Sequence, residues 1–101
     1  MTYPSPIYLG QFEPVVAGDA TDEFIDLEND LVTGETVTSV AYTVTTSAGA
    51  TVAGAVSTST ESGTRSDFRY SLASAGVYTL KAVFTISDGQ TITRTATLWA
   101  V

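Results

Sequence analysis

The sequence contains neither cysteine nor histidine. Without cysteine no disulfide can cross-link the fold, so stability has to come from a buried apolar core, which a chain of 101 residues is long enough to form. Without histidine the usual general base and the commonest metal ligand are missing. Gly-x-Ser-x-Gly motifs and phosphate-binding glycine loops are also missing from the sequence. We therefore expect a non-enzymatic protein with no catalytic residue, no cofactor and no metal site.

Positive charge is scarce as well. Four Lys and Arg residues stand against 11 Asp and Glu residues, which gives a net charge of −7. A surface of this sign repels phosphate backbones and anionic lipid headgroups. No apolar run approaches the roughly 20 residues that a membrane-spanning helix needs. We expect no nucleic-acid partner and no membrane partner.

The N-terminal residues, MTYPSPIYLG, lack the basic start and the continuous apolar stretch of a signal peptide. They predict a cytosolic translation product, although a secreted protein trimmed of its signal would look the same. Pro4 and Pro6 restrict the backbone and withhold two hydrogen-bond donors. We expect residues 1–6 to form an extended arm that precedes a single domain over residues 7–101.

Threonine, serine and valine dominate the sequence, in short runs that alternate apolar and polar residues. β-Branched residues favour strands, and Gly-containing turn signals separate the runs. We place strands at 7–16, 22–28, 36–46, 50–58, 64–72, 77–86 and 91–99, with 50–58 at a sheet edge. Residues 29–35 could form one helical turn with Leu31 as an apolar plug. The pattern predicts an all-β fold, a seven-stranded antiparallel immunoglobulin-like sandwich.

The alternation also predicts which side chains face the core. The inward set is Ile25, Leu27, Val40, Tyr42, Val44, Phe68, Tyr70, Leu72, Tyr78, Leu80, Ala82, Phe84, Ile86, Ile92, Ala96 and Leu98. Asp88-Gly89 predicts a hairpin between the last two strands. Tyr78, two residues before Leu80, predicts the corner at which a Tyr hydroxyl bonds back to nearby backbone. The alternative is a simple buried Tyr with some other partner.

An acidic run precedes the middle of the chain. Its members are Asp19, Asp22, Glu23, Asp26, Glu28 and Asp30. Carboxylate oxygens suit Ca²⁺, but the spacing is not that of a calcium-binding loop. On a strand, Asp22 and Asp26 would share a face with Phe24. We therefore interpret the run as a solvated acidic edge.

Several large apolar residues fall outside the inward set. Phe24 lies opposite Ile25, and Trp99 falls among threonines, opposite Leu98. Because a contiguous exposed apolar patch marks an interface, we predict a protein interface from them. The candidates are Tyr3, Ile7, Tyr8, Phe12, Phe24, Val83 and Trp99. The alternative is that the N-terminal arm folds over Trp99 and buries it within the monomer.

Two stretches resemble a group of short bacteriophage virion proteins, the fibre–tail adaptor family. They are DEFIDLENDLVTGETVTSVAYTV (residues 22–44) and the ending GQTITRTATL (residues 89–98). The shared features are Asp26-Leu27, Leu31, the segment 34–39 and the run 42–44. With the corner at 76–80, the resemblance covers about three quarters of the chain, in keeping with one immunoglobulin-sized unit. Leu27 and Tyr42 depart from it, since relatives often carry Trp there.

The resemblance implies a structural protein of the virion, assembled in the host cytoplasm. It would join tail or connector proteins to fibres or to neighbouring subunits, and it would self-associate in a symmetric particle. A capsid decoration protein is one alternative within this class. A second alternative is a carbohydrate- or receptor-binding module, in which Trp99 with Tyr3 or Tyr8 would form an aromatic platform.

Overall fold

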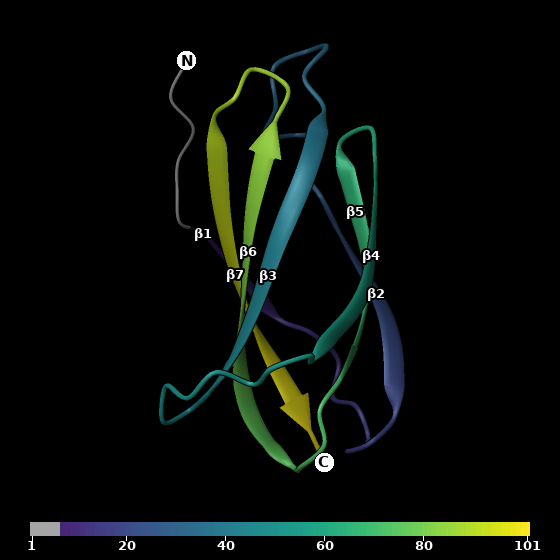
Figure 1. The fold of residues 1–101 in the computed structure, drawn as a ribbon, viewed down its shortest axis with the longest axis vertical. Coiled ribbons are helices and arrows are strands. Elements are labelled where there is room, and N and C mark those ends of the chain that lie inside the picture. The colour runs from purple at the N-terminus through teal and green to yellow at the C-terminus, as the bar shows by residue number, and fades with distance from the viewer. Residues whose placement is uncertain (1–6) are drawn as a thin grey trace.

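Seven β-strands in two sheets make up the regular structure of residues 7–101, which are the residues that the computed structural model describes (Figure 1). The strands are β1 (Ile7–Gln11), β2 (Ala20–Asp26), β3 (Val37–Thr46), β4 (Val56–Ser62), β5 (Arg65–Ser71), β6 (Gly76–Ile86) and β7 (Thr91–Ala100). This described range has no helix, and so none that could cross a membrane. The prediction of an all-β chain with about seven strands is confirmed.

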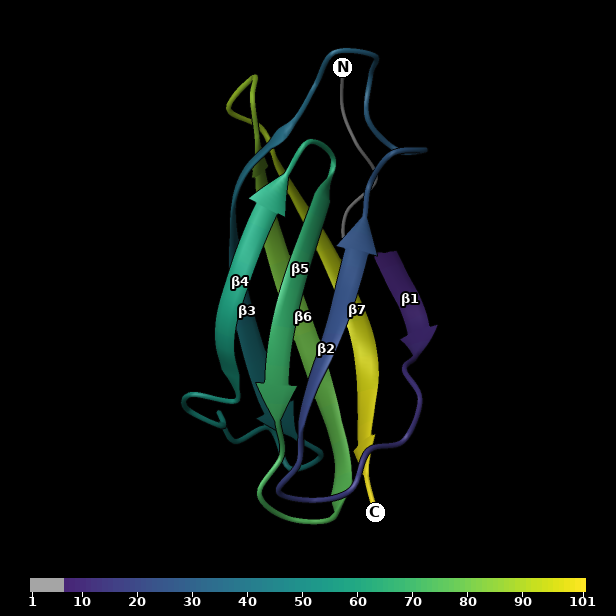
Figure 2. The same cartoon turned by 90° about the vertical axis from the view of Figure 1, so that its right-hand side faces the viewer.

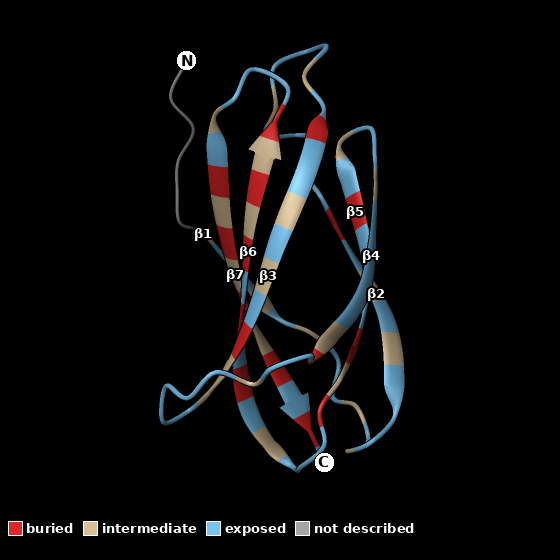
Figure 3. Cartoon of the chain, viewed as in Figure 1, coloured by how far each residue is buried: buried red, intermediate tan, exposed pale blue. Residues whose placement is uncertain are grey.

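One sheet has four strands in the order β1-β7-β6-β3, and the other has three in the order β2-β5-β4. Figure 2 shows the three-stranded sheet in front of the four-stranded one, a β-sandwich-like arrangement. Buried and exposed residues alternate along the strands because successive side chains point to opposite faces (Figure 3). The whole predicted inward set is buried or packed against the core, so the core prediction is confirmed.

β1 departs from the expected antiparallel arrangement, since it pairs with β7 in parallel. Parallel neighbours need a long connection, and here the rest of the chain provides it. β1 also ends at Gln11 and not at residue 16, after a register shift near Gly10, whose φ is +101°. The chain beyond it still follows β7, with Val15 N–H donating to the Trp99 carbonyl at 2.9 Å.

The expected strand at 50–58 is wrong, because β4 begins at Val56 and runs to Ser62. Residues before it turn at Gly54, whose φ is +73°, and Val52 N–H donates to the Val44 carbonyl on β3. The hairpin at residues 63–64 pairs β4 with β5 and so sets its limits. β4 lies at the edge of its sheet, as predicted. Small Ser and Thr side chains carry too little periodicity to locate a strand.

The predicted hairpin forms, and the Tyr78 hydroxyl bonds to upstream backbone. Ile86 N–H donates to the Gln90 carbonyl at 3.0 Å, which closes the loop between β6 and β7. Tyr78 is buried, and its hydroxyl donates to the Ser74 carbonyl at 2.7 Å. Leu80, two residues further on, is fully buried. The predicted contact of Tyr78 with upstream backbone is therefore confirmed.

The loop after β2 carries the expected plug. Leu31 packs against the core, and its N–H donates to the Leu27 carbonyl at 3.1 Å. The same loop brings Asp30 within 3.6 Å of the guanidinium of Arg94. Arg94 stands at an inward position of β7 and is only 1% exposed, which we did not predict. A buried charge requires a compensating partner, and the Asp30 carboxylate supplies one.

Candidate functional site

The outer face of the four-stranded sheet, which we call the threonine face, carries three of the seven residues predicted for an interface, namely Tyr8, Val83 and Trp99. It consists of Tyr8, Ser39, Ala41, Thr43, Thr45, Val77, Thr79, Lys81, Val83, Thr85, Thr91, Thr93, Thr95, Thr97 and Trp99. Strand pairing sets them in rows across the sheet, for example Thr95–Lys81–Thr43. β-Branched side chains in register give a broad surface of methyl and hydroxyl groups.

The threonine face is poor in charge. Lys81 is the one charged side chain among its described residues, and none of them is Asp or Glu. The chain as a whole carries a net charge of −7. The acidic groups are therefore concentrated elsewhere on the surface. Depletion of charge is what distinguishes the centre of a protein–protein interface from ordinary surface.

Apolar groups are concentrated at the end of this face where β7 finishes. Trp99 is 41% exposed and lies directly across from Val77, which is 52% exposed. Tyr8 is 61% exposed, and its hydroxyl shares a hydrogen bond of 2.8 Å with Oγ1 of Thr97. This bond holds the Tyr8 side chain over β7. Exposed Trp and Tyr side chains are typical of interface hot spots.

The structure separates the remaining interface candidates. Val83 is half-buried on the threonine face, whereas Ile7 is half-buried in register with the inward Arg94. Phe12 packs against the core with its ring 6.1 Å from that of Phe68. Phe24 lies on the outer face of the other sheet. Tyr3 and the expected arm lie outside the described residues.

Sequence reasoning missed Val77. Its exposure and its position opposite Trp99 place it with the apolar residues of the threonine face. The signal was available, because Val77 shares the outward parity of Val83 on the same strand. It was overlooked because a single exposed valine is ordinary, and only the pairing with Trp99 makes it part of a patch.

The outer face of the three-stranded sheet, which we call the charged face, has a different chemistry. It consists of Asp22, Phe24, Asp26, Thr58, Thr60, Ser62, Arg65, Asp67 and Arg69. Strand pairing sets these residues in three rows across β2, β5 and β4. The rows are Asp22–Arg69–Thr58, Phe24–Asp67–Thr60 and Asp26–Arg65–Ser62. Carboxylates and guanidiniums thus alternate with hydroxyl groups.

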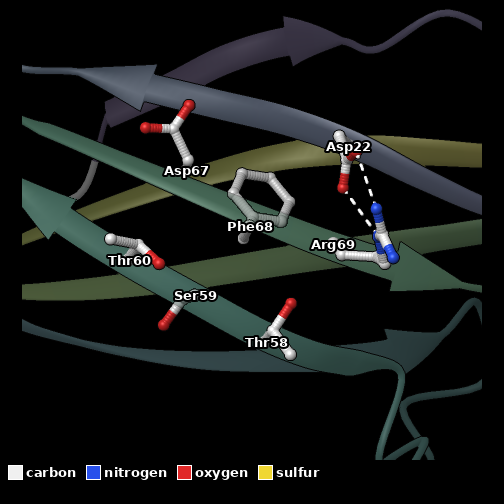
Figure 4. Close-up of a pocket in the computed structure, with 7 residues that line it drawn as sticks. All are labelled: Asp22, Thr58, Ser59, Thr60, Asp67, Phe68 and Arg69. Carbon is white, nitrogen blue, oxygen red and sulfur yellow. Dashed lines mark hydrogen bonds and ion pairs between the residues drawn. The ribbon is translucent and has the colours of Figure 1, made fainter.

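Four of the five charged side chains of this face form two ion pairs, Arg69–Asp22 and Arg65–Asp67. Arg69 donates from Nε and Nη2 to the two carboxylate oxygens of Asp22 at 2.8 and 3.0 Å (Figure 4). This hydrogen bonding lowers the pKa of Asp22 below its ordinary value. Arg65 donates to Asp67, with Nη2 2.7 Å from Oδ1, and its Cζ lies 3.9 Å from the centre of the Phe24 ring. Two-pronged contacts of this kind hold both partners in one orientation.

A hollow of about 300 Å³ opens on the charged face. Its lining residues come from all three strands and are Asp22, Thr58, Ser59, Thr60, Asp67, Phe68 and Arg69. In Figure 4 the Asp22–Arg69 pair lies at one end and Asp67 at the other, with Thr58 and Thr60 along the β4 side. The hollow therefore presents donors and acceptors from several directions.

A third polar feature lies between the sheets. The Tyr42 hydroxyl is 2.5 Å from Oγ of Ser66, which in turn donates to the Glu61 carboxylate at 3.1 Å. Burial raises the pKa of Tyr42 to about 12. These groups satisfy one another across β3, β5 and β4 and have a structural role.

A scan of the sequence against protein-family models finds no match, and a search of curated proteins finds none either. The resemblance to phage fibre–tail adaptors therefore stays a prediction. Within residues 7–101, no group of three or more acidic, His or Cys side chains could hold a metal ion.

Proposed function

We propose that this chain is a non-enzymatic interaction module that docks onto neighbouring proteins through its threonine face. The observation that carries the proposal is the distribution of charge. The chain has a net charge of −7, yet the described residues of this face include Lys81 and no acidic residue. Removing a carboxylate from water would cost free energy, and docking through this face removes none.

The apolar residues of the face supply the affinity. Burying one large apolar side chain contributes roughly 1.5–3 kcal/mol. Trp99 and Val77 offer such area at one end of the face. Tyr8, which pairs with Thr95 in the row of Lys81, adds apolar area next to Thr97. Lys81 lies nearer the middle, where its single charge would orient a partner that carries a carboxylate. The face thus combines an apolar anchor with one electrostatic contact.

The module is proposed to be immunoglobulin-like. In that fold strands C, F and G form one sheet and B, E and D belong to the other. The orders β3-β6-β7 and β2-β5-β4 agree with this arrangement. The bond from the Tyr78 hydroxyl to the Ser74 carbonyl is the kind of corner contact found at the start of strand F.

The setting that we propose is a bacteriophage virion, on the basis of the sequence resemblance to fibre–tail adaptors. The partners would be tail, connector or fibre proteins and further copies of the same chain. When several copies bind around a symmetric particle, the overall affinity exceeds that of one interface, so a modest interface is sufficient for stable attachment. A small module with one charge-poor face is suited to such a bridging role.

Two aromatic substitutions on opposite faces test the docking surface. Trp99→Ala should weaken self-association, or co-purification with neighbouring virion proteins, by about 30-fold, because truncating a hot-spot residue costs about 2 kcal/mol or more. Phe24→Ala, on the charged face, is the matched control and should leave both unchanged. The measurements are size-exclusion chromatography with light scattering and quantitative pull-down.

The melting temperature distinguishes docking from folding. Trp99→Ala should leave the melting temperature of the monomer nearly unchanged, because the Trp99 side chain points away from the core. A fall of several degrees in the isolated monomer would show that Trp99 stabilises the fold and would contradict the proposal. Mass spectrometry of purified particles from cells that carry the gene tests the setting, and the absence of the protein would exclude a virion role.

A further inference from the structure

The hollow on the charged face has a chemistry that docking through the opposite face does not use. We propose that it is a binding site for a neutral saccharide. Its walls carry the Asp22–Arg69 pair, the Asp67 carboxylate and the hydroxyl groups of Thr58 and Thr60. Each sugar hydroxyl both donates and accepts, so it can bridge a carboxylate and a guanidinium or a threonine.

The polar groups are oriented before any ligand arrives. Asp22 fixes the Arg69 guanidinium through two hydrogen bonds, and Arg65 fixes the Asp67 carboxylate through three, two to Oδ1 and one to Oδ2. Long side chains that are already held lose little conformational entropy on binding. In the described part of the chain, Arg69 uses Nε and Nη2 for Asp22, which leaves Nη1 to donate to a ligand.

The balance of charge selects the class of ligand. An anion would meet the carboxylates of Asp22 and Asp67, and a cation would meet Arg69. Because both carboxylates already have arginine partners, their charges are compensated within the protein. A neutral polyhydroxylated molecule gains hydrogen bonds from both kinds of group and is repelled by neither.

An exposed aromatic ring lies next to this hollow. Phe24 is 48% exposed and is paired across β2 and β5 with Asp67. Arg65 stacks over one side of the ring and restrains it. Aromatic surface beside polar groups is what a saccharide requires, since its C–H faces are apolar and its rim is polar. The site thus extends from the Asp22–Arg69 pair toward Phe24.

Paired threonine substitutions on the two outer faces test the site. Thr58→Val with Thr60→Val removes the two hydroxyls while keeping side-chain shape and strand preference. Thr43→Val with Thr95→Val does the same on the threonine face and serves as the matched control. The full chain and both double variants would be titrated separately with maltohexaose, cellohexaose and laminarihexaose at up to about 10 mM, followed by amide chemical shifts.

The proposal predicts that at least one hexasaccharide shifts amides of β2, β4 and β5 with an affinity on the order of millimolar. The Thr58/Thr60 double variant should bind at least about tenfold more weakly, and the Thr43/Thr95 variant should bind as the unaltered chain does. Three outcomes would overturn it: no shift with any of the sugars, shifts confined to residues around Trp99, or equal shifts of the hollow by inorganic phosphate. The first and third outcomes leave docking through the threonine face untouched, and docking is tested by association and not by sugar binding, so the two proposals fail separately.

Discussion

The two outer faces of this sandwich are built from similar strands and end with opposite properties. Both use a two-residue period and both are rich in Ser and Thr. The charged face carries three carboxylates and two guanidiniums, namely Asp22, Asp26, Asp67, Arg65 and Arg69. The threonine face carries the charge of Lys81 beside exposed Tyr8, Val77 and Trp99. A net charge for the whole chain conceals this asymmetry.

The two faces differ in whether their side chains interact within the face or remain exposed to water. On the charged face, Arg65 and Arg69 pair with carboxylates of the same face. On the threonine face, the apolar area of Trp99 and Val77 remains partly in water. Paired polar groups interact favourably with each other and with water. Exposed apolar area, in contrast, lowers the free energy only when it is buried against a partner. We infer that the first face recognises a polar ligand and the second face docks.

A carboxylate placed on each face in turn should produce the largest difference between the two faces. Val83→Asp should weaken association by on the order of 100-fold, because leaving a charge buried and unpaired at an interface costs about 2–5 kcal/mol. Thr60→Asp, on the charged face, should leave association unchanged. Sedimentation velocity over a concentration series measures both. Equal weakening by the two variants would show that overall charge, and not the threonine face, governs association.

A smaller effect is expected from removing the hydrogen bond between Tyr78 and Ser74, which contributes to the stability of the fold. Tyr78→Phe removes the hydroxyl that donates to the Ser74 carbonyl and keeps the buried ring. We expect a loss of about 1 kcal/mol in the free energy of unfolding, or about 4–8 °C in melting temperature. Urea denaturation and calorimetry measure it. A larger loss of stability in Trp99→Ala than in Tyr78→Phe would reverse the assignment of core and surface.

The smallest effect should come from breaking an ion pair of the charged face. In Arg69→Gln, the pKa of Asp22 should rise toward its ordinary value, which an NMR pH titration of the carboxyl carbon would follow. Because the pKa of Asp22 is lower in the folded state, the pair stabilises the fold when the pH is above the ordinary pKa of the carboxyl group. This contribution disappears as the pH falls through the pKa of the folded state. Because the pair is exposed, the melting temperature at neutral pH should not change measurably. A marked fall would show that the pair supports the fold as well as orienting the hollow.

Features that depend on near neighbours along the chain could be predicted from the sequence. A two-residue period sorted side chains into inward and outward sets, which is how Phe24, Val83 and Trp99 could be predicted to face outward. Asp88-Gly89 indicated the last hairpin, and the spacing of Tyr78 and Leu80 indicated the corner. These signals are local because they arise from backbone geometry within a few residues.

Which outward sets share a surface depends on how distant strands pair in the fold. Phe24 and Trp99 were grouped in one predicted interface, but their strands belong to different sheets, whose outer faces point away from each other. Asp22 and Arg69 are 47 residues apart in sequence and meet because β2 pairs with β5. The parallel pairing of β1 with β7 and the burial of Arg94 beside Asp30 follow from long-range contacts as well. A two-residue period predicts whether a side chain points outward. Hydrogen bonding between distant strands determines which other side chains are its neighbours.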